Sequence, residues 1–577
     1  MKRRLLISIA ALVASCGLVY AVGALEQAIK PKPELASWLP EGALLSIEAR
    51  DFNSLLGDWN LSEEKRAWLV SDNHAAFSNS RLFTRLSQAQ DEFSVAAGLP
   101  ADESLLDKVA GKESCIALYD IGNLEFVYLT RLDESSFKST PLWQTRGKFE
   151  ERSEAGSNFY VRKDEQSSRV AAFASKDGWL ILATREDLLA GVLDRMAGIV
   201  AQNLAGEGWY AEAVKQAASE RGDLRMVLNL RKIVPSPYFR SYWVQRNVTE
   251  MKQYAAAVSD LYRTSQSYRE ERVLERRVAS VAVPQIDMNN LVALVPDDAA
   301  FYAAQAAPET EKLLDELRTN LLEMKPQSAA APSTNAPSAA RAEDAGNATQ
   351  FDMTIDNAPA AVKQLDAYEP LRALLVAAQP ESSIEIYSSR PPRDSVFVSL
   401  QSAMALTSSR PWDVEAVRQA LTQALFPGLT AGRLGVQWTK HSSAAGEFLE
   451  LDGAVPLFVA VNGSQLLLSN DSTLLDEMLA RRTTQGQAGE KNTMTYTALF
   501  RLRQEQGNFR RLMKQLDLAG HGSAASQDGS GNSAAPAFFS GNVANLGRAF
   551  ANMDSERIVE NDRGTMVTQT VTYQWTH

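Results

Sequence analysis

Short apolar runs separated by polar spacers recur along most of the chain. Three of them, at residues 159–162, 170–173 and 179–182, follow one another closely. Runs of this length, bounded by turn-forming residues, are typical of strands. The spacers at 164–168 and 175–178 supply the Asp, Ser and Gly residues that tight hairpin turns use. The pattern therefore predicts an antiparallel meander in this part of the chain.

A helix is predicted directly after the third of these strands. Its apolar positions recur with helical spacing at Leu188, Leu189, Val192, Leu193 and Met196. Thr184 and Asp187 have the spacing of a capping box, in which the Thr hydroxyl would accept a hydrogen bond from a first-turn amide. Asn470 precedes a second segment with the same apolar spacing. Meander and helix together predict an α+β fold, with helices packed on one face of an antiparallel sheet.

The order of these patterns is repeated once along the chain. The matched pairs are LPEGA (39–43) with VPDDA (295–299), ESCIALY (113–119) with ESSIEIY (381–387), WLILATREDLLAGVL (179–193) with QLLLSNDSTLLDEML (465–479), and LRMVLNLR (224–231) with YTALFRLR (496–503). Each match is short, and the shared order carries the weight. It predicts two copies of one α+β plan, at residues 31–290 and 291–577.

Two segments of the second copy differ in composition from the rest. Residues 326–350 and 519–537 are rich in Ala, Ser, Gly and Pro and contain few large apolar side chains. Such segments cannot offset their ordering entropy by burial. We expect both to be flexible insertions.

The N-terminal residues 1–30 contain a strongly apolar segment. Lys2, Arg3 and Arg4 precede an uncharged run of 21 residues from Leu5 to Leu25. A helix of this length spans a hydrocarbon core of about 30 Å. Basic residues stay on the cytoplasmic side, so the sequence predicts a single-pass inner-membrane anchor with the body in the periplasm.

Two alternatives for this segment stay open. Small residues at Gly23 and Ala24 are compatible with a cleaved signal peptide. Residues 13–16 (VASC) resemble the site at which bacterial lipoproteins are cut and acylated, here at Cys16. The apolar run continues past Cys16, which favours the retained anchor.

Composition and charge narrow the function classes. The 577 residues include 59 basic and 70 acidic side chains, a net charge of −11. This balance argues against nucleic-acid binding, which needs a basic surface. Two cysteines and four histidines argue against a disulfide scaffold or a multi-zinc protein. Cys115 lies in an apolar stretch and is expected to be buried on a strand, and no cofactor is expected.

The densest polar block is the first candidate binding site: Ser71, Asp72, Asn73, His74 and Arg81. The structural interpretation is that Ser71 or Asp72 caps the next helix and that the other side chains bond loop carbonyls. The functional interpretation is a small binding site, because the second copy has no counterpart. The chain has no G-x-S-x-G elbow and no K-T-G element, so no catalytic set is predicted.

A second candidate is a basic, aromatic surface formed by Arg231, Lys232, Arg240, Tyr242 and Trp243. Such a surface suits anionic headgroups or an acidic partner. The alternative is that the aromatic rings belong to the core and the basic residues pair with acids of the next segment, such as Glu270 and Glu271.

Two blocks, SDNHAAFSNSRLFTRL (71–86) and ALYDIGNLEFVYLTRL (117–132), carry a resemblance. Together with the anchor and the duplication, they resemble an uncharacterised, domain-of-unknown-function family of bacterial envelope proteins. The resemblance implies a periplasm-facing protein. It also implies an association with gene clusters that encode alpha-2-macroglobulin-like proteins, and it implies no catalytic residues.

These observations favour a non-enzymatic, membrane-anchored periplasmic protein that binds or scaffolds another envelope protein. One alternative is a carrier that holds a lipid or another apolar ligand between sheet and helices. Another is a hydrolase built around Ser71 and His74.

Overall fold

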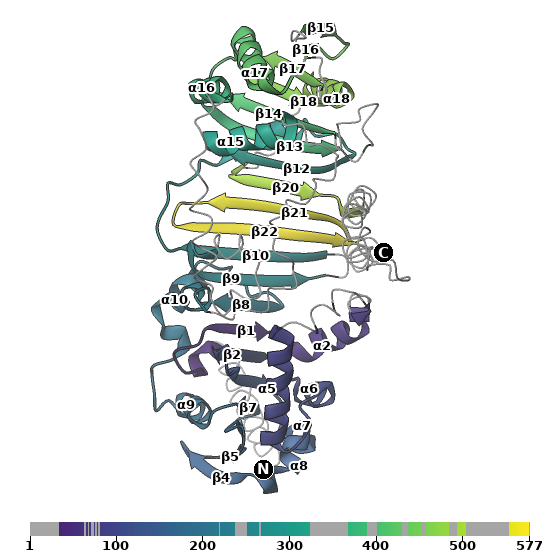
Figure 1. Ribbon diagram of the computed structural model, residues 1–577. Helices are drawn as coiled ribbons and strands as arrows, with labels where there is room; N and C mark the ends of the chain where they lie inside the picture. Colours follow the sequence, from purple (N-terminus) through teal and green to yellow (C-terminus); the bar gives the residue numbers. More distant parts are fainter. Residues whose placement is uncertain are drawn as a thin grey trace, which may run out of the picture. The chain divides into compact units, whose positions relative to one another are not determined.

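The computed structural model describes residues 34–62, 65–66, 69–70, 74, 78, 81–218, 220–236, 251–264, 267–322, 367–388, 390, 401–429, 437–451, 456–483, 493–503 and 553–575. They form a mixed α+β fold built on antiparallel strands, as the periodicity predicts (Figure 1). The chain divides into two compact units. Unit 1 contains residues up to Asn53, Leu86–Lys215 and Met226–Ile233, and unit 2 contains Ser54–Arg85, Gln216–Arg225 and the chain from Val234.

The strands of unit 1 pair in the order β4–β5–β6–β7–β3–β2–β1, and β8, which belongs to this unit from Met226 onward, pairs with β1. Their bounds are β1 Leu45–Ala49, β2 Ser114–Asp120, β3 Glu125–Arg131, β4 Glu150–Glu154, β5 Ser157–Lys163, β6 Val170–Lys176, β7 Trp179–Ala183 and β8 Leu224–Leu228. The predicted meander is confirmed as β5, β6 and β7. Cys115 is buried on β2, as expected.

The strands of unit 2 pair in the order β9–β10–β22–β21–β20–β12–β13–β14–β18–β17–β16–β15. Their bounds are β9 Tyr254–Arg263, β10 Ser267–Arg276, β12 Ala299–Ala306, β13 Pro380–Ser388, β14 Ser402–Ser408, β15 Trp438–Ser442, β16 Glu447–Leu451, β17 Leu457–Asn462, β18 Gln465–Ser469, β20 Tyr496–Phe500, β21 Met553–Asp562 and β22 Met566–Trp575. A separate short pair joins β11 (Ile286–Asp287) to β19 (Thr493–Met494).

Helices cover both faces of the sheet in unit 2, so the prediction of one covered face is wrong. Met404 and Leu406 of β14 share a core with α15 (Thr310–Leu317), α16 (Glu369–Ala378) and α17 (Val414–Leu429). Ala403 and Ala405 share another core with α14 (Asn289–Val292) and α18 (Ser472–Thr483). Neighbouring strand residues point to opposite faces, which places the two cores on opposite sides of the strand.

Unit 1 has the same two-sided arrangement. One core joins Phe173 and Leu182 to α5 (Arg81–Ala97), α6 (Glu103–Val109), α7 (Glu134–Ser139) and α8 (Pro141–Gln144). Helix α9 (Glu186–Met196) contacts β6 and β7 as well. All five residues of β7 are buried. A strand buried on both faces reads as a continuous apolar run and not as an alternation, which is why the sequence pattern concealed the second helix layer.

Strands β9, β10, β22 and β21 are consecutive neighbours in the sheet of unit 2 (Figure 1), and the two inner strands, β10 and β22, bury few apolar side chains. Val273 is the buried residue of β10, and Val567 and Val571 are those of β22. The remaining side chains of these two strands are half-buried or exposed. We call these four strands the ribbon.

The predicted capping box at the start of α9 is wrong. The Thr184 hydroxyl accepts a hydrogen bond from the backbone N–H of Phe126 (2.9 Å), on the neighbouring strand β3. Asp187 accepts from the guanidinium of Arg185 (3.0 Å). The hydroxyl therefore joins the end of β7 to β3 and leaves the first turn of the helix uncapped by a side chain.

Among the described residues, none of the helices is long and apolar enough to cross a membrane. The predicted anchor at residues 5–25 lies outside the described residues, as do the predicted insertions at 326–350 and 519–537.

Two-sided burial makes a stability prediction. Leu406 and Leu467 are fully buried in the two different cores of unit 2. We expect Leu406→Ala and Leu467→Ala each to lower the free energy of unfolding by about 2–5 kcal/mol, because each leaves a cavity. Denaturant titration measures this, with Val278→Ala, at an exposed position, as the control. A near-neutral effect at either leucine would contradict two covered faces.

Candidate functional site

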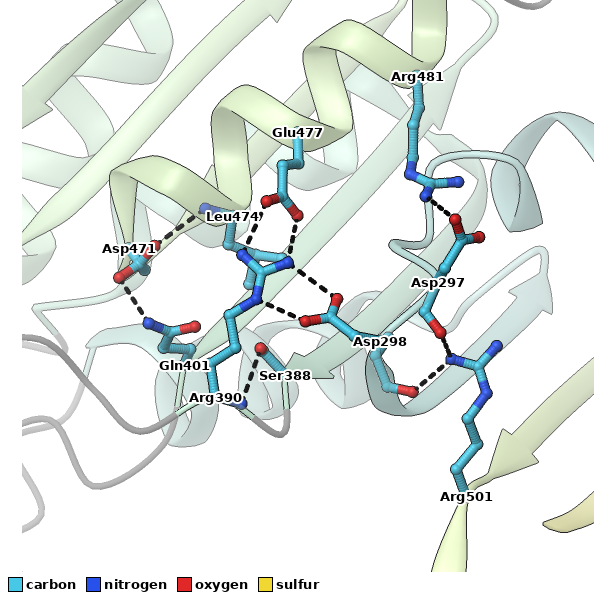
Figure 2. Close-up of polar contacts among 11 residues, drawn as sticks. Asp297, Asp298, Ser388, Arg390, Gln401, Asp471, Leu474, Glu477, Arg481 and Arg501 are labelled. Atoms are coloured by element: carbon cyan, nitrogen blue, oxygen red, sulfur yellow. Dashed lines mark hydrogen bonds and ion pairs between the residues drawn. The ribbon is translucent and has the colours of Figure 1, made fainter. Parts of the chain in front are cut away.

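One extended polar cluster in unit 2 centres on Arg390 (Figure 2). Its Nε and Nη2 donate to the two carboxylate oxygens of Asp298, at 2.6 and 2.9 Å. Its Nη1 and Nη2 donate to the two oxygens of Glu477, both at 2.8 Å. Both pairs are bidentate, the strongest geometry available to a guanidinium. The hydrogen bonds to Glu477 and Asp298 raise the pKa of Arg390.

Two further arginines hold the loop that precedes β12. Arg481, four residues beyond Glu477 on α18, pairs with Asp297 at 2.8 Å. Arg501, directly after β20, donates to the backbone carbonyls of Asp297 and Ala299, the latter at 2.9 Å. Figure 2 shows both arginines converging on this loop. We call Arg390, Arg481, Arg501, Asp297, Asp298 and Glu477 the arginine network.

Helix α18 is also fixed at its N-terminus. Asp471 accepts from the N–H of Leu474 (2.9 Å), as an N-cap does. Its other carboxylate oxygen accepts from the amide of Gln401 (2.9 Å). Asn470 accepts from the backbone N–H of Ser402 and donates to the hydroxyl of the same residue, at 2.9 and 3.0 Å. The helix that carries Glu477 and Arg481 is therefore tied to β14.

The role of the arginine network is to hold parts of the fold in position. Each carboxylate in it faces a guanidinium. The guanidinium of Arg390 bonds to Asp298 and Glu477, and its backbone N–H donates to the Ser388 hydroxyl (3.1 Å). An arginine saturated by two carboxylates has little to offer an anionic ligand. The network fixes a loop against a helix.

A second cluster brings together a carboxyl group of the sheet and a carboxyl group of helix α15. Glu385 of β13 accepts from the Asn320 amide (3.1 Å) and from the Tyr387 hydroxyl (3.4 Å). Glu316 of α15 accepts from the Gln305 amide (3.1 Å). Burial, and then the nearby charge of Glu316, raise the pKa of Glu385 to about 7. Burial also raises the pKa of Glu316.

This carboxyl pair is a proton-binding group and not a metal centre. Within the described part of the chain, no group of three or more His, Cys, Asp or Glu side chains is placed to hold a metal ion. The amide and phenol groups that bond to the pair neither accept nor release protons near neutrality. The Lys312 ammonium lies 3.9 Å from a Glu316 carboxylate oxygen, and its charge opposes the rise in pKa of both carboxyl groups. Its chemical capacity is to take up a proton as the pH falls.

The structure describes part of the Ser71–Arg81 candidate. Ser71, Asp72 and Asn73 lie outside the described residues. The His74 Nε2 is 3.5 Å from the Ser78 hydroxyl, which donates to the His74 carbonyl at 2.8 Å. That shorter bond is the local back-bond of a helical Ser and leaves the hydroxyl poorly placed as a nucleophile. Arg81 begins α5, and its side chain is outside the described residues.

The basic, aromatic candidate is likewise described in part. Arg231 and Lys232 are exposed on the short helix α11 (Leu230–Ile233). Arg240, Tyr242 and Trp243 lie outside the described residues. The predicted surface therefore stays a prediction.

Sequence reasoning passed over both clusters that the structure brings together. Asp297 and Asp298 are part of the VPDDA match, which indicates a repeat but not the ion pairs that these two residues form. Glu385 stood between two isoleucines of a predicted strand. An acid inside an apolar strand, and two adjacent acids before one, were the available signals.

No protein-family model matches the chain, and no curated protein matches it. Among solved structures, crystal forms I and III of TP0453 resemble it, each with 9% sequence identity and a TM-score of 0.24. The likeness covers 44% of this chain and 82% and 83% of the TP0453 chains. A similarity at this level assigns no function.

The arginine network predicts that removing Arg390 destabilises the protein more than removing an exposed arginine does. Arg390→Ala leaves Asp298 and Glu477 facing each other without their shared cation. We expect a loss of about 1–3 kcal/mol in the free energy of unfolding. Arg418→Ala, which breaks an exposed pair with Glu415 on α17, is the control and should cost about 0.5 kcal/mol or less. Equal losses in denaturant titration would contradict the clamping role.

The carboxyl pair predicts a pH dependence. Since the folded-state pKa of Glu385 is raised to about 7, its contribution to stability is complete below the unfolded value near 4.5 and is lost as the pH rises through about 7. Glu385→Gln stays neutral and removes that loss. Between about pH 5 and pH 8 its unfolding free energy should fall by about 1–3 kcal/mol less than that of the wild type. Glu381→Gln, exposed on the same strand, should follow the wild type.

Proposed function

We propose that this protein is a non-enzymatic envelope protein that binds another protein through its ribbon. The apolar segment at residues 5–25 anchors it in the inner membrane, and the body lies in the periplasm. The observation that carries the proposal is the ribbon itself, two long hairpins in which most side chains of β10 and β22 remain half-buried or exposed.

The side chains of the ribbon suit a protein partner. Tyr262, Arg269, Thr572 and Arg557 lie opposite one another on four consecutive strands, which places them in one row on one face. The Arg269 guanidinium stacks over the Tyr262 ring at 4.4 Å. Tyr and Arg are enriched where proteins bind one another, because they combine area with directional hydrogen bonds.

The two halves of the body are copies of one plan under this proposal. The pairing order β4–β5–β6–β7–β3–β2–β1–β8 in one half matches β15–β16–β17–β18–β14–β13–β12–β20 in the other. The sequence matches occur in the same order along the chain in both halves, and the strands also occur in the same order in the sheet. Both observations support a duplication.

Equivalent hydrogen bonds support the same proposal. Thr184 accepts from the N–H of Phe126, and Asn470 accepts from that of Ser402, at the same place between two paired strands. The N–H of Asn229 donates to the carbonyl of Leu44, and that of Arg501 to the carbonyl of Ala300, both at 2.8 Å. The two halves thus make equivalent hydrogen bonds at equivalent places in the sheet, the first pair with different side chains and the second with backbone groups.

The two hairpins of the ribbon, β9–β10 and β21–β22, are related by an approximate two-fold symmetry in their strand registers. In β9–β10, Val258 lies opposite Val273, and in β21–β22 the residues 299 positions further on lie opposite each other. In β10–β22 the register runs evenly to either side of the Glu271–Thr570 pair. A self-complementary pairing of this kind is what a two-fold interface between equivalent elements requires.

Photo-crosslinking tests the proposed partner surface. A benzophenone amino acid introduced at Arg269 or Arg557 in the full chain, in native membranes, should give the same protein adduct from both positions. Lys138, exposed on α7, is the matched control and should not give it. No adduct from the ribbon, or the same adduct from Lys138, would contradict binding through the ribbon.

A further inference from the structure

The connection between β10 and β11, residues 277–285, lies in water along most of its length. All nine residues are described, and eight of them are exposed, with Val283 half-buried. Val278 and Val281 are exposed to 81% and 90%. No helix or strand is assigned between the two flanking strands. The exposed apolar side chains therefore belong to one continuous, irregular piece of chain within unit 2.

Two backbone hydrogen bonds tie this connection to its neighbours in the part of the chain that the structure describes. The N–H of Arg277 donates to the carbonyl of Gln253 (2.7 Å), and the N–H of Ser280 donates to that of Gly564 (2.9 Å), in the turn between β21 and β22. Single hydrogen bonds at the surface contribute little, because water replaces them. The connection can therefore open locally while the strands on either side stay paired.

The charges beside the connection lie at its first end. Arg277 is exposed, as is Arg563 in the turn that contacts the connection, whereas Arg276 is ion-paired with Asp562. The stretch from Val278 to Ile286 carries no charge, and its first five residues are Val, Ala and Ser. A partner that binds this stretch thus meets small, uncharged side chains after one exposed arginine.

We propose that the connection is a cleavage site for an endoprotease that accepts small apolar side chains, and that the two pieces of the chain stay together after the cut. An extended peptide is bound through its backbone N–H and C=O groups, and exposed connections of small residues are preferred sites of cleavage. The bonds after Val278 and Val281 follow the two most exposed side chains of the connection that the structure quantifies.

The reaction is the hydrolysis of one peptide bond. Water adds its hydroxyl group to the carbonyl carbon before the bond and a proton to the amide nitrogen after it, so the step needs no other co-reactant. The products are a new carboxyl terminus on the first piece and a new amino terminus on the second. This proposal is independent of the binding proposed for the ribbon.

Strand pairing holds the two pieces together after the cut. β10 belongs to the first piece and β22 to the second, and nine residue pairs join these strands. The ion pair between Arg276 and Asp562 fixes the end of β10 directly before the connection. Cleavage removes none of these contacts. The pieces are then held by the sheet and no longer by the covalent chain.

Limited digestion of the full chain in detergent micelles tests the cleavage site. The probe is a trace of pancreatic elastase, which cleaves after small apolar residues, and the fragments are identified by mass. We expect a cut after Val278 or Val281. The double variant Val278→Asp with Val281→Asp should slow cleavage of the connection about tenfold or more, since an apolar pocket rejects a carboxylate. Val376→Asp, at a 55% exposed position on helix α16, is the matched control and should leave that rate unchanged.

The digestion has results that would overturn each part of the proposal. No cut in the connection, or a cut after Val376 that is as fast, would remove the cleavage site, because exposure alone would then not select it. An unchanged rate in the double variant would do the same. Pieces that separate on size-exclusion chromatography without denaturant would overturn their association, whereas we expect cut and intact protein to elute together.

Terminal sequencing of the chain isolated from native membranes tests whether the cut occurs in the cell. We expect a fraction of the chain to begin at Ala279 or Ala282, and this fraction to disappear in the double variant. A new terminus at Val278 would place the cut after Arg277 and overturn the preference for small apolar side chains. A connection that stays intact in every molecule would overturn the site as one used in the cell.

Discussion

The backbone hydrogen-bond ladder between β10 and β22 is the interaction on which unit 2 depends. It joins strands 299 residues apart in sequence, and few apolar side chains are buried along it. Polar pairs across the neighbouring strands, such as Gln569–Glu560 between β22 and β21 (2.7 Å), add only a few tenths of a kcal/mol to about 1 kcal/mol each. The ladder therefore carries the continuity of the sheet in unit 2. Such non-local pairing forms slowly, because a long loop must close first.

The arginine network gains meaning beside the proposed first copy. In the matched segments Gly42 stands where the second copy has Asp298, and Gly191 stands where it has Glu477. A Cβ at Gly191 would meet Pro40 at 3.2 Å and the Arg195 guanidinium at 2.9 Å. If the halves are the two copies we propose, the first packs Gly191 directly against Pro40 at this position, and the second holds the position with ion pairs. The arginine network would then serve the second copy and not the common fold.

Local patterns predicted the strands and helices well, because meander strands and the apolar face of a helix depend on residues that are close in sequence. The three meander strands, α9 and the burial of Cys115 could all be foreseen. Features that depend on distant neighbours could not. Thr184 bonds to β3 and not to its own helix, since a paired strand offers its hydroxyl a fixed N–H. Strands buried on both faces likewise hid the second helix layer.

Register explains why the carboxyl pair escaped notice. The match of ESCIALY with ESSIEIY aligns Ile116 with Ile384, yet Ile116 lies opposite Tyr128 and Ile384 lies opposite Ala405. The strands can instead be compared through the residues they pair with. Tyr128 and Met404 pair with matched residues of β7 and β18, so under the proposed duplication Ile116, opposite Tyr128, corresponds to Glu385, opposite Met404. A slip of one residue exchanges the two faces of a strand. Sequence similarity therefore placed an isoleucine where the sheet presents a carboxyl group.

The edges of the sheets limit how the proposed partner could bind. Edge strands invite the addition of another strand unless charges oppose it. In the described registers β4 pairs only with β5 and β15 only with β16. β4 carries Glu150, Glu151, Arg152 and Glu154, and β15 carries Lys440. Strand addition at these edges would bring charged side chains against a neighbouring backbone, whereas the ribbon offers its faces without that obstacle. A partner that reads side chains on a face is thus favoured over one that extends the sheet.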